Sequence, residues 1–167
     1  DGSKTDYEGE YAVDGKADTR WSSGPLNSKL GLGGEPKDQY IIVDLGAGKN
    51  TIDEIKVSYF KKVWPTNYTV EVSADKNTWE TVKTIERNSS NDLNVVDDFK
   101  LEEAKNARYV RLSFPKDGLN TNAAGSSVSI TELEVYGTKE NVELDTTALE
   151  QQIAATEEII KNAEAEP

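Results

Sequence analysis

The sequence predicts an all-β protein, built as an antiparallel sandwich or barrel and followed by one C-terminal helix. Short segments in which apolar and polar residues alternate recur between residues 39 and 137. Residues that favour turns separate these segments, and this combination is typical of antiparallel sheets with one buried face. Apolar residues with a helical spacing first appear after Gly137, which places the helix at the end of the chain.

Six segments are predicted to form strands. They comprise residues 39–46, 55–60, 67–73, 78–85, 107–114 and 128–137. In the first strand the predicted buried face carries Ile41, Val43 and Leu45, and the opposite face carries Tyr40, Ile42 and Asp44. The buried faces of three further strands are predicted to carry Ile55, Val57 and Tyr59, then Tyr68, Val70 and Val72, and then Val110, Leu112 and Phe114 or their neighbours. The turn sequence at residues 74–77 joins the third and fourth strands as a hairpin.

The last predicted strand contains a break in its alternation. Its first two apolar residues share one parity, namely Val128 and Ile130. The next two have the opposite parity, namely Leu133 and Val135. A regular strand cannot bury both pairs, so we predict a β-bulge near residues 131–132. Such a bulge would redirect Glu132 or a backbone carbonyl toward another part of the molecule.

A helix is predicted near the C-terminus, after a polar linker. Thr147 and Glu150 have the spacing of a capping box, which marks a helix start. The apolar stripe of this helix comprises Leu149, Ile153, Thr156, Ile160 and Ala163. We therefore divide the chain into a sandwich domain, residues 1–139, and a linker with an amphipathic helix, residues 140–167. The narrow stripe leaves two interpretations open, since the helix either packs back onto the sheet or begins a following helical module.

The composition excludes several classes of partner and of chemistry. The chain of 167 residues carries 19 Lys and Arg against 31 Asp and Glu, a net charge of −12. That charge opposes binding to nucleic acid and to anionic membranes. The chain contains neither His nor Cys, which excludes disulfides, thiolate metal sites and the commonest general base. Only carboxylate chemistry would be left to an enzyme, and no acidic pair stands out, so we expect a protein that is not an enzyme.

Residues 12–23 contain the residue types of a calcium-binding loop. Asp14 offers a carboxylate, Gly15 permits a tight curl, and Thr19 offers a hydroxyl and a carbonyl. Glu132, at the predicted bulge, would supply a second carboxylate and balance a divalent charge. Calcium prefers about six to eight oxygen ligands of these kinds. The same residues also fit an Asp-Gly turn with an Asx-type hydrogen bond and no metal, so both interpretations stay open.

Two motifs resemble those of a known family. They are D-G-x-x-x-T-x-W at residues 14–21 and E-x-E-V-Y-G at residues 132–137. With the strands between them, the chain resembles the discoidin or coagulation-factor type C domains, and most closely the bacterial carbohydrate-binding modules of family 32. The resemblance implies a jelly-roll-like, galactose-binding-domain-like β-sandwich with a structural Ca²⁺. The implied metal ligands are the side chains of Asp14, Thr19 and Glu132 and the carbonyls of Tyr11, Lys16, Thr19 and Thr131.

The resemblance also implies that a sugar would bind in loops at one end of the sandwich. It makes Trp21 a core residue and leaves Trp64, in the loop of residues 60–67, either a ligand platform or a loop anchor. The other candidate contacts are Lys61, Arg87, Asn94, Asn120 and Asn122. The two asparagines of the loop at residues 116–127 either form a wall of the site or belong to a solvated connection. Lys61 stands where galactose-binding members carry a His, which leaves GlcNAc and GalNAc open beside galactose.

The predicted function is non-catalytic glycan binding. The domain would direct a covalently linked, secreted bacterial glycoside hydrolase to terminal sugars of host or complex glycans. We expect an extracellular or cell-surface location, and the start at Asp1 rather than Met suggests a piece of a longer parent. The alternative is an adhesion domain that binds a protein or a membrane surface. The Gly-rich residues 31–36 lack the Lys-Ser/Thr of a phosphate loop and are predicted to form an ordinary loop.

Overall fold

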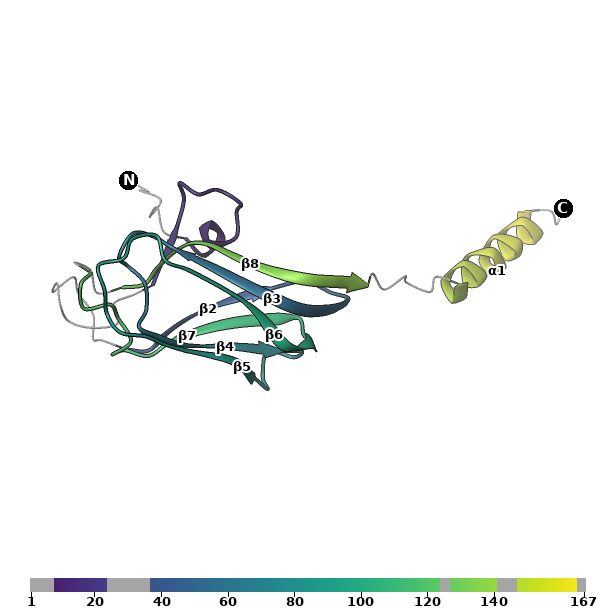
Figure 1. Cartoon of the computed structure of the whole chain (residues 1–167). Coiled ribbons are helices and arrows are strands. Elements are labelled where there is room, and N and C mark those ends of the chain that lie inside the picture. The colour runs from purple at the N-terminus through teal and green to yellow at the C-terminus, as the bar shows by residue number, and fades with distance from the viewer. Residues whose placement is uncertain (1–7, 24–36, 124–126, 141–146, 165–167) are drawn as a thin grey trace, which may run out of the picture.

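The computed structural model shows two antiparallel β-sheets packed face to face as a sandwich (Figure 1). It describes residues 8–23, 37–123, 127–140 and 147–164, so the Gly-rich residues 31–36 lie outside the described ranges. The first sheet has the strand order β1-β8-β3-β6, and the second sheet has the order β2-β7-β4-β5. This arrangement confirms the predicted all-β sandwich.

Each of the six predicted strands has a counterpart in the structure. The strands are β1 Trp21–Ser22, β2 Gln39–Asp44, β3 Lys49–Tyr59, β4 Asn67–Ser73, β5 Glu80–Glu86, β6 Val96–Asn106, β7 Tyr109–Phe114 and β8 Ser129–Glu140. A short 3-10 helix, η1 (Gly9–Ala12), precedes β1, and the α-helix α1 (Thr147–Glu164) follows β8. Strands β3 and β8 are longer than predicted, and β4 and β5 form the predicted hairpin.

The predicted alternation produces the core between the two sheets. Tyr68 in β4 and Leu112 and Phe114 in β7 are buried, together with the other inward residues predicted for these strands and for β3. The ring centroids of Tyr68 and Phe114 lie 5.6 Å apart, and Trp21 lies 6.1 Å from Phe114. Trp21 therefore packs against the core as predicted. Full burial of each such apolar side chain contributes about 1.5–3 kcal/mol to stability.

The predicted β-bulge is present in β8. Ser58 of β3 lies opposite Glu132, whereas the next residue, Tyr59, lies opposite Ile130. Thr131 is therefore the extra residue, and its Oγ1 donates a hydrogen bond to the Ser58 carbonyl at 3.1 Å. The bulge allows Ile130 and Leu133 both to be buried, which a strand of uninterrupted parity could not do.

Strand β6 was not predicted, because a charged residue occupies one of its inward positions. Asp97 lies opposite the buried Val57, where a regular alternation would place an apolar side chain. Its carboxylate instead accepts hydrogen bonds from Tyr68 and Arg87. The strand also lies at an edge of the first sheet, so its outward residues are mostly polar and the apolar signal is weak.

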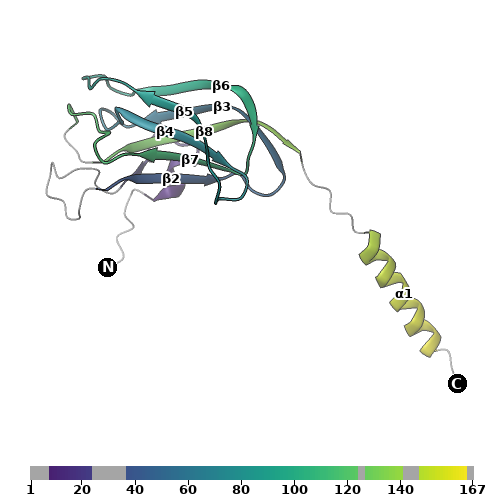
Figure 2. The same cartoon turned by 90° about the horizontal axis from the view of Figure 1, so that it is seen from below.

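The C-terminal helix α1 lies apart from both sheets (Figures 1 and 2). It begins at Thr147, the residue predicted to start it. Ile153 and Ile160, which belong to the predicted apolar stripe, are exposed. Within the described residues, no helix combines the length and the hydrophobicity that a membrane span requires.

Candidate functional site

The Asp-Gly loop that follows η1 gathers several oxygen atoms around Asp14. Gly15 adopts a φ of +74°, which lets the chain curl so that Asp14 Oδ1 accepts the N–H of Lys16 at 3.0 Å. The hydroxyl of Thr19 lies 2.8 and 2.9 Å from the two carboxylate oxygens of Asp14 and 3.0 Å from the Lys16 carbonyl. The predicted Asx-type hydrogen bond is therefore present, and it holds the carboxylate, the hydroxyl and the carbonyl together.

Glu132 reaches the same loop from the bulge of β8. Burial raises the pKa of its carboxyl above the ordinary value, the N–H of Gly15 opposes this shift, and the negative charge of Asp14 adds to it. Two carboxylates from distant parts of the chain thus lie close enough to repel each other. A divalent cation would relieve that repulsion. The Lys16 ammonium lies 3.9 Å from Asp14 Oδ2 but is largely exposed.

This donor set fits the chemistry of a Ca²⁺ site. It combines carboxylate, hydroxyl and carbonyl oxygens on a tightly curled loop, the mixture that Ca²⁺ prefers. The described part of the chain holds no cluster of three or more acidic, His or Cys side chains that could bind a metal. The site would therefore rest on Asp14, Glu132, Thr19 and backbone carbonyls. The carbonyl ligands predicted at Tyr11, Thr19 and Thr131 stay predictions.

Trp64 is buried in the loop end of the sandwich, which consists of residues 60–66, 87–95 and 115–123. Its exposed fraction is 1%, and its Nε1 donates a hydrogen bond to the carbonyl of Asp92 at 3.1 Å. The prediction that Trp64 offers an exposed platform for a sugar is wrong, and the alternative of a loop anchor is confirmed. The reason is that Pro65 pairs with Leu119 in an isolated bridge and holds this loop against its neighbour.

Asn120 is also internal, so the prediction that it forms a wall of a sugar site is wrong. Its exposed fraction is 0%. Its Nδ2 donates to the carbonyls of Lys62 and Ser90 at 3.1 Å each, and its Oδ1 accepts the N–H of Asn122. One amide side chain therefore satisfies groups from all three loops and holds them together.

Arg87, another predicted sugar contact, belongs to an internal ion pair. Its Nη1 lies 2.8 Å from Asp97 Oδ1 and its Nη2 contacts Oδ2, while Tyr68 donates to the same carboxylate at 2.7 Å. The side chains of Arg87 and Asp97 are only 22% and 11% exposed. The guanidinium also lies 5.4 Å from the Trp64 ring centroid. These contacts hold the guanidinium next to Trp64 and Asp97, and the predicted contact of Arg87 with a sugar stays a prediction.

The three remaining predicted contacts lie exposed at the loop end. They are Lys61, Asn94 and Asn122. The N–H of Asn94 donates to the carbonyl of Lys61 at 3.2 Å, and both residues adopt positive φ values of +56° and +49°. The structure thus brings Lys61 and Asn94 together from separate loops. Nearby, Lys62 Nζ donates to Asn91 Oδ1 at 2.7 Å, a contact that the sequence reasoning did not include.

Comparison with known proteins identifies the family of the chain. The F5/8 type C domain family matches residues 2–133. The chain belongs to this family. No curated protein sequence matches this F5/8 type C domain significantly.

Solved structures of binding modules resemble this F5/8 type C domain. Chitosan-binding module 2 of a chitosanase/glucanase from Paenibacillus sp. IK-5, solved in complex with chitotriose, is 30% identical, with 80% of this chain and 88% of that chain covered and a TM-score of 0.59. Module 1 of that enzyme is 28% identical, with 80% and 87% covered and a TM-score of 0.60. CpGH89CBM32-5 from Clostridium perfringens, in complex with GalNAc-β-1,3-galactose, is 23% identical, with 77% and 82% covered and a TM-score of 0.56. The predicted resemblance to discoidin-like domains and family 32 modules is confirmed.

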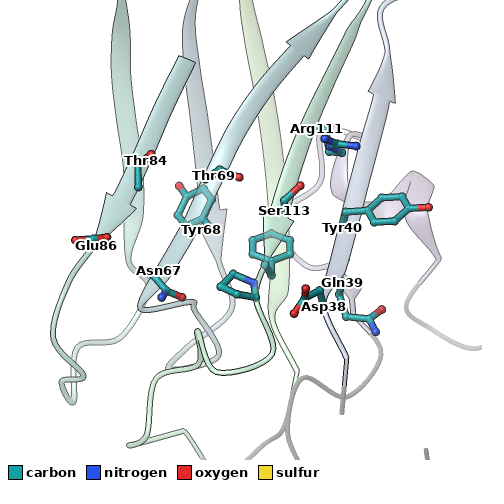
Figure 3. Close-up of a pocket in the computed structure, with 12 residues that line it drawn as sticks. Asp38, Gln39, Tyr40, Asn67, Tyr68, Thr69, Thr84, Glu86, Arg111 and Ser113 are labelled. Atoms are coloured by element: carbon teal, nitrogen blue, oxygen red, sulfur yellow. The ribbon is translucent and has the colours of Figure 1, made fainter. Parts of the chain in front are cut away.

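A groove of 470 Å³ on the outer face of the second sheet is a further feature of the F5/8 type C domain (Figure 3). Residues of β2, β4, β5 and β7 line it, and Tyr40 at its edge is 63% exposed. The alternation of β2 predicted an outward position for Tyr40, which was not among the predicted site residues. An aromatic residue at an outward position was the signal that could have found it.

Proposed function

We propose that this domain is a non-catalytic glycan-binding module whose ligand binds at the loop end. The proposal rests on one observation: the buried side chains of Trp64 and Asn120 hold the three loops together through hydrogen bonds. These two side chains use their polar groups within the protein and leave Lys61, Asn94 and Asn122 exposed above them. A rim that is ordered before binding loses little entropy when a sugar docks on it.

The similar structures support amino sugars and their derivatives as the first ligands to test. Those neighbours are described as chitosan-binding or are solved with chitotriose and GalNAc-β-1,3-galactose. Among the predicted sugar types, GlcNAc and GalNAc therefore take precedence over galactose. The position of Lys61 favours the same order, because an ammonium cannot accept the hydrogen bond that a neutral imidazole nitrogen could accept.

The parent protein is proposed to be a secreted bacterial glycoside hydrolase that carries this domain as a covalently linked accessory. The module would hold the catalytic domain close to its glycan outside the cell. A shallow rim gives weak binding, with a dissociation constant of about 1 μM to 1 mM, or about −8 to −4 kcal/mol. Linkage to a catalytic domain or to other modules raises the effective affinity without any new contact.

A structural Ca²⁺ is proposed at the Asp-Gly loop. Asp14, Thr19, Glu132 and the Lys16 carbonyl would hold it, and the ion would neutralise the two neighbouring carboxylates. In that position it would join the loop after η1 to the bulge of β8, two segments that are distant in the sequence. The ion would act on the stability of the sandwich rather than on the sugar itself.

Two matched lysine variants test the loop-end proposal. Lys61 and Lys76 are both exposed and both adopt a positive φ, +49° and +66°. Lys76 lies in the turn after β4, at the end of that strand opposite the loop end. Replacing either residue by Ala therefore removes an exposed ammonium from the same backbone conformation.

The glycan is first chosen on an array that includes GlcNAc, GalNAc and galactose termini, and affinities are then measured by isothermal titration calorimetry. We expect Lys61→Ala to weaken binding by about tenfold, because one charge-assisted hydrogen bond is lost. Lys76→Ala should bind like the unchanged protein. Equal affinities for the two variants, or an array without any bound glycan, would overturn the proposal.

A further inference from the structure

The outer face of the second sheet presents a row of sugar-compatible side chains across all four strands. In the strand register, Tyr40 of β2 lies beside Ser113 of β7, Ser113 beside Thr69 of β4, and Thr69 beside Thr84 of β5. Figure 3 shows Tyr40 on one side of the groove and Thr84 on the other, with Thr69 and Ser113 between them. The row therefore combines one exposed aromatic residue with three hydroxyl groups, of which those of Thr69 and Thr84 can donate or accept hydrogen bonds and that of Ser113 can accept them.

The next row of residues holds this face rigid. Arg111 makes two hydrogen bonds to the carboxylate of Glu71, at 2.7 and 2.9 Å, and Ser113 donates to the same carboxylate at 2.7 Å. The guanidinium of Arg111 also lies 4.1 Å from the Trp79 ring centroid. The charges of Arg111 and Glu71 thus compensate each other, and both side chains are held in one orientation.

Two further carboxylates give the groove a net negative charge. Asp38 immediately precedes β2 and Glu86 ends β5, and the two lie on opposite sides of the groove (Figure 3). Asp38 accepts the backbone N–H of Lys116 at 2.9 Å. Both carboxylates belong to exposed residues, while Arg111, the basic residue of the lining, is already paired with Glu71. A cationic ligand would therefore be favoured over a neutral or an anionic one.

We propose that this groove is a second saccharide site, which takes a short oligosaccharide with free amino groups such as a glucosamine oligomer. Tyr40 would pack against the apolar face of a sugar ring, and the row of hydroxyls would bond to sugar hydroxyls. Asp38 and Glu86 would pair with the ammonium groups. The volume of 470 Å³ is within the range of roughly 300–1,000 Å³ that is typical of small-ligand sites. The site uses none of the residues proposed for the loop end.

An NMR titration of the ¹⁵N-labelled chain tests this proposal. The probes are the trisaccharides of glucosamine and of N-acetylglucosamine, added at pH 6, where the free amine is protonated. We expect the glucosamine trisaccharide to shift the amide signals of residues 38–40, 67–69, 84–86 and 111–114. The N-acetylated trisaccharide should shift these signals at least about fivefold less at equal concentration, because it lacks the charge.

Variants with matched controls assign the effect to named side chains. Tyr40→Ala should weaken glucosamine binding by about tenfold, whereas Tyr136→Ala, which removes another exposed tyrosine from the first sheet, should leave it unchanged. Glu86→Gln should weaken binding of the charged sugar and leave binding of the N-acetylated sugar unchanged. Circular dichroism melting checks that each variant is folded.

Failure of the groove proposal and failure of the loop-end proposal would give different experimental results. Lys61→Ala should leave the groove signals unchanged, and loss of those signals in this variant would show that they report the loop end. The groove proposal is overturned by shifts confined to residues 60–66, 87–95 and 115–123, by equal effects of Tyr40→Ala and Tyr136→Ala, or by the absence of any shift. Groove shifts without binding at the loop end would support this site and contradict the proposed function.

Discussion

The loop end and the outer face of the second sheet place their large aromatic rings in opposite ways. Trp64 belongs to a polar loop, yet it is 1% exposed, whereas Tyr40 belongs to a regular strand and is 63% exposed. The three loop segments are joined by scattered backbone hydrogen bonds, such as that from the N–H of Thr66 to the Gly118 carbonyl at 2.8 Å. The buried Trp64 ring adds packing between them. The strand is already held by its neighbours, so its outward side chain is free to meet a ligand. A position in a loop therefore does not show that a side chain is exposed. The parity of a residue within a strand does show which side of the sheet its side chain faces.

The largest expected difference is in stability. Trp64→Ala removes a buried ring and the hydrogen bond to Asp92, and should lower the free energy of unfolding by about 3–5 kcal/mol. Tyr40→Ala removes an exposed ring and should change the free energy of unfolding by less than about 0.5 kcal/mol. Urea denaturation followed by circular dichroism measures both. A Trp64→Ala variant as stable as Tyr40→Ala would contradict the assignment of Trp64 to the interior.

The internal ion pair beneath the loop end should have the next largest effect. Asp97→Asn leaves Arg87 without its counter-ion and should destabilise the domain by about 3 kcal/mol. The matched control is Glu80→Gln, which removes the partner of Lys105 in a more exposed pair with an N–O distance of 2.8 Å. That change should cost less than about 1 kcal/mol. Equal losses in thermal or urea unfolding would show that Arg87 and Asp97 behave as a surface pair.

Calcium binding should raise stability through Glu132 and not through its neighbour Glu134. At a free Ca²⁺ concentration of about 100 times the dissociation constant, binding adds about 2.7 kcal/mol to the free energy of unfolding. Glu132→Gln should lose this gain. Glu134→Gln should retain it, because the Glu134 carboxylate pairs with Lys56 at 2.7 Å. Differential scanning calorimetry with calcium and with chelator compares them, and a gain that survives Glu132→Gln would contradict the proposed ligand set.

The smallest effect concerns the pH dependence of the metal-free domain. The folded state holds the proton of Glu132 more tightly than the unfolded state, since the pKa of this carboxyl is raised from 4.5. The free energy of unfolding should therefore fall as the pH rises above about 4.5, until the folded-state pKa is passed. Measured against Glu132→Gln in chelator, the unchanged protein should lose stability over this window. A difference that grows in the opposite direction would contradict the burial of the Glu132 carboxyl, the main cause of its raised pKa.

The sequence was sufficient for features that follow from periodicity. The parity of Val128, Ile130 and Leu133 predicted the bulge that the register of β8 confirms. The buried faces of β3, β4 and β7 followed from the same alternation. The inward Asp97 broke that alternation, so β6 was missed. Its burial is explained by Arg87 and Tyr68, which are distant in the sequence.

The contacts of the loop end could not be predicted in this way. Trp64, Arg87 and Asn120 have the residue types of a sugar site, and those same types can also satisfy buried carbonyls and carboxylates. Whether these residues bind a sugar or stabilise the interior depends on how the three loops pack together. No local sequence pattern predicts that packing. The Asp-Gly loop was more predictable, because Asp14, Gly15 and Thr19 form their turn within a few residues.

In the proposed function, a sugar binds to exposed residues of the loop end while the Trp64 ring stays buried beneath them. A crystal structure of the domain soaked with Ca²⁺ and a GlcNAc-terminated oligosaccharide tests it most directly. We expect sugar density in contact with Lys61 and Asn94, with Trp64 Nε1 still bonded to the Asp92 carbonyl. A sugar ring stacked on an outward-facing Trp64 indole, or density for the sugar elsewhere with the rim empty, would contradict it.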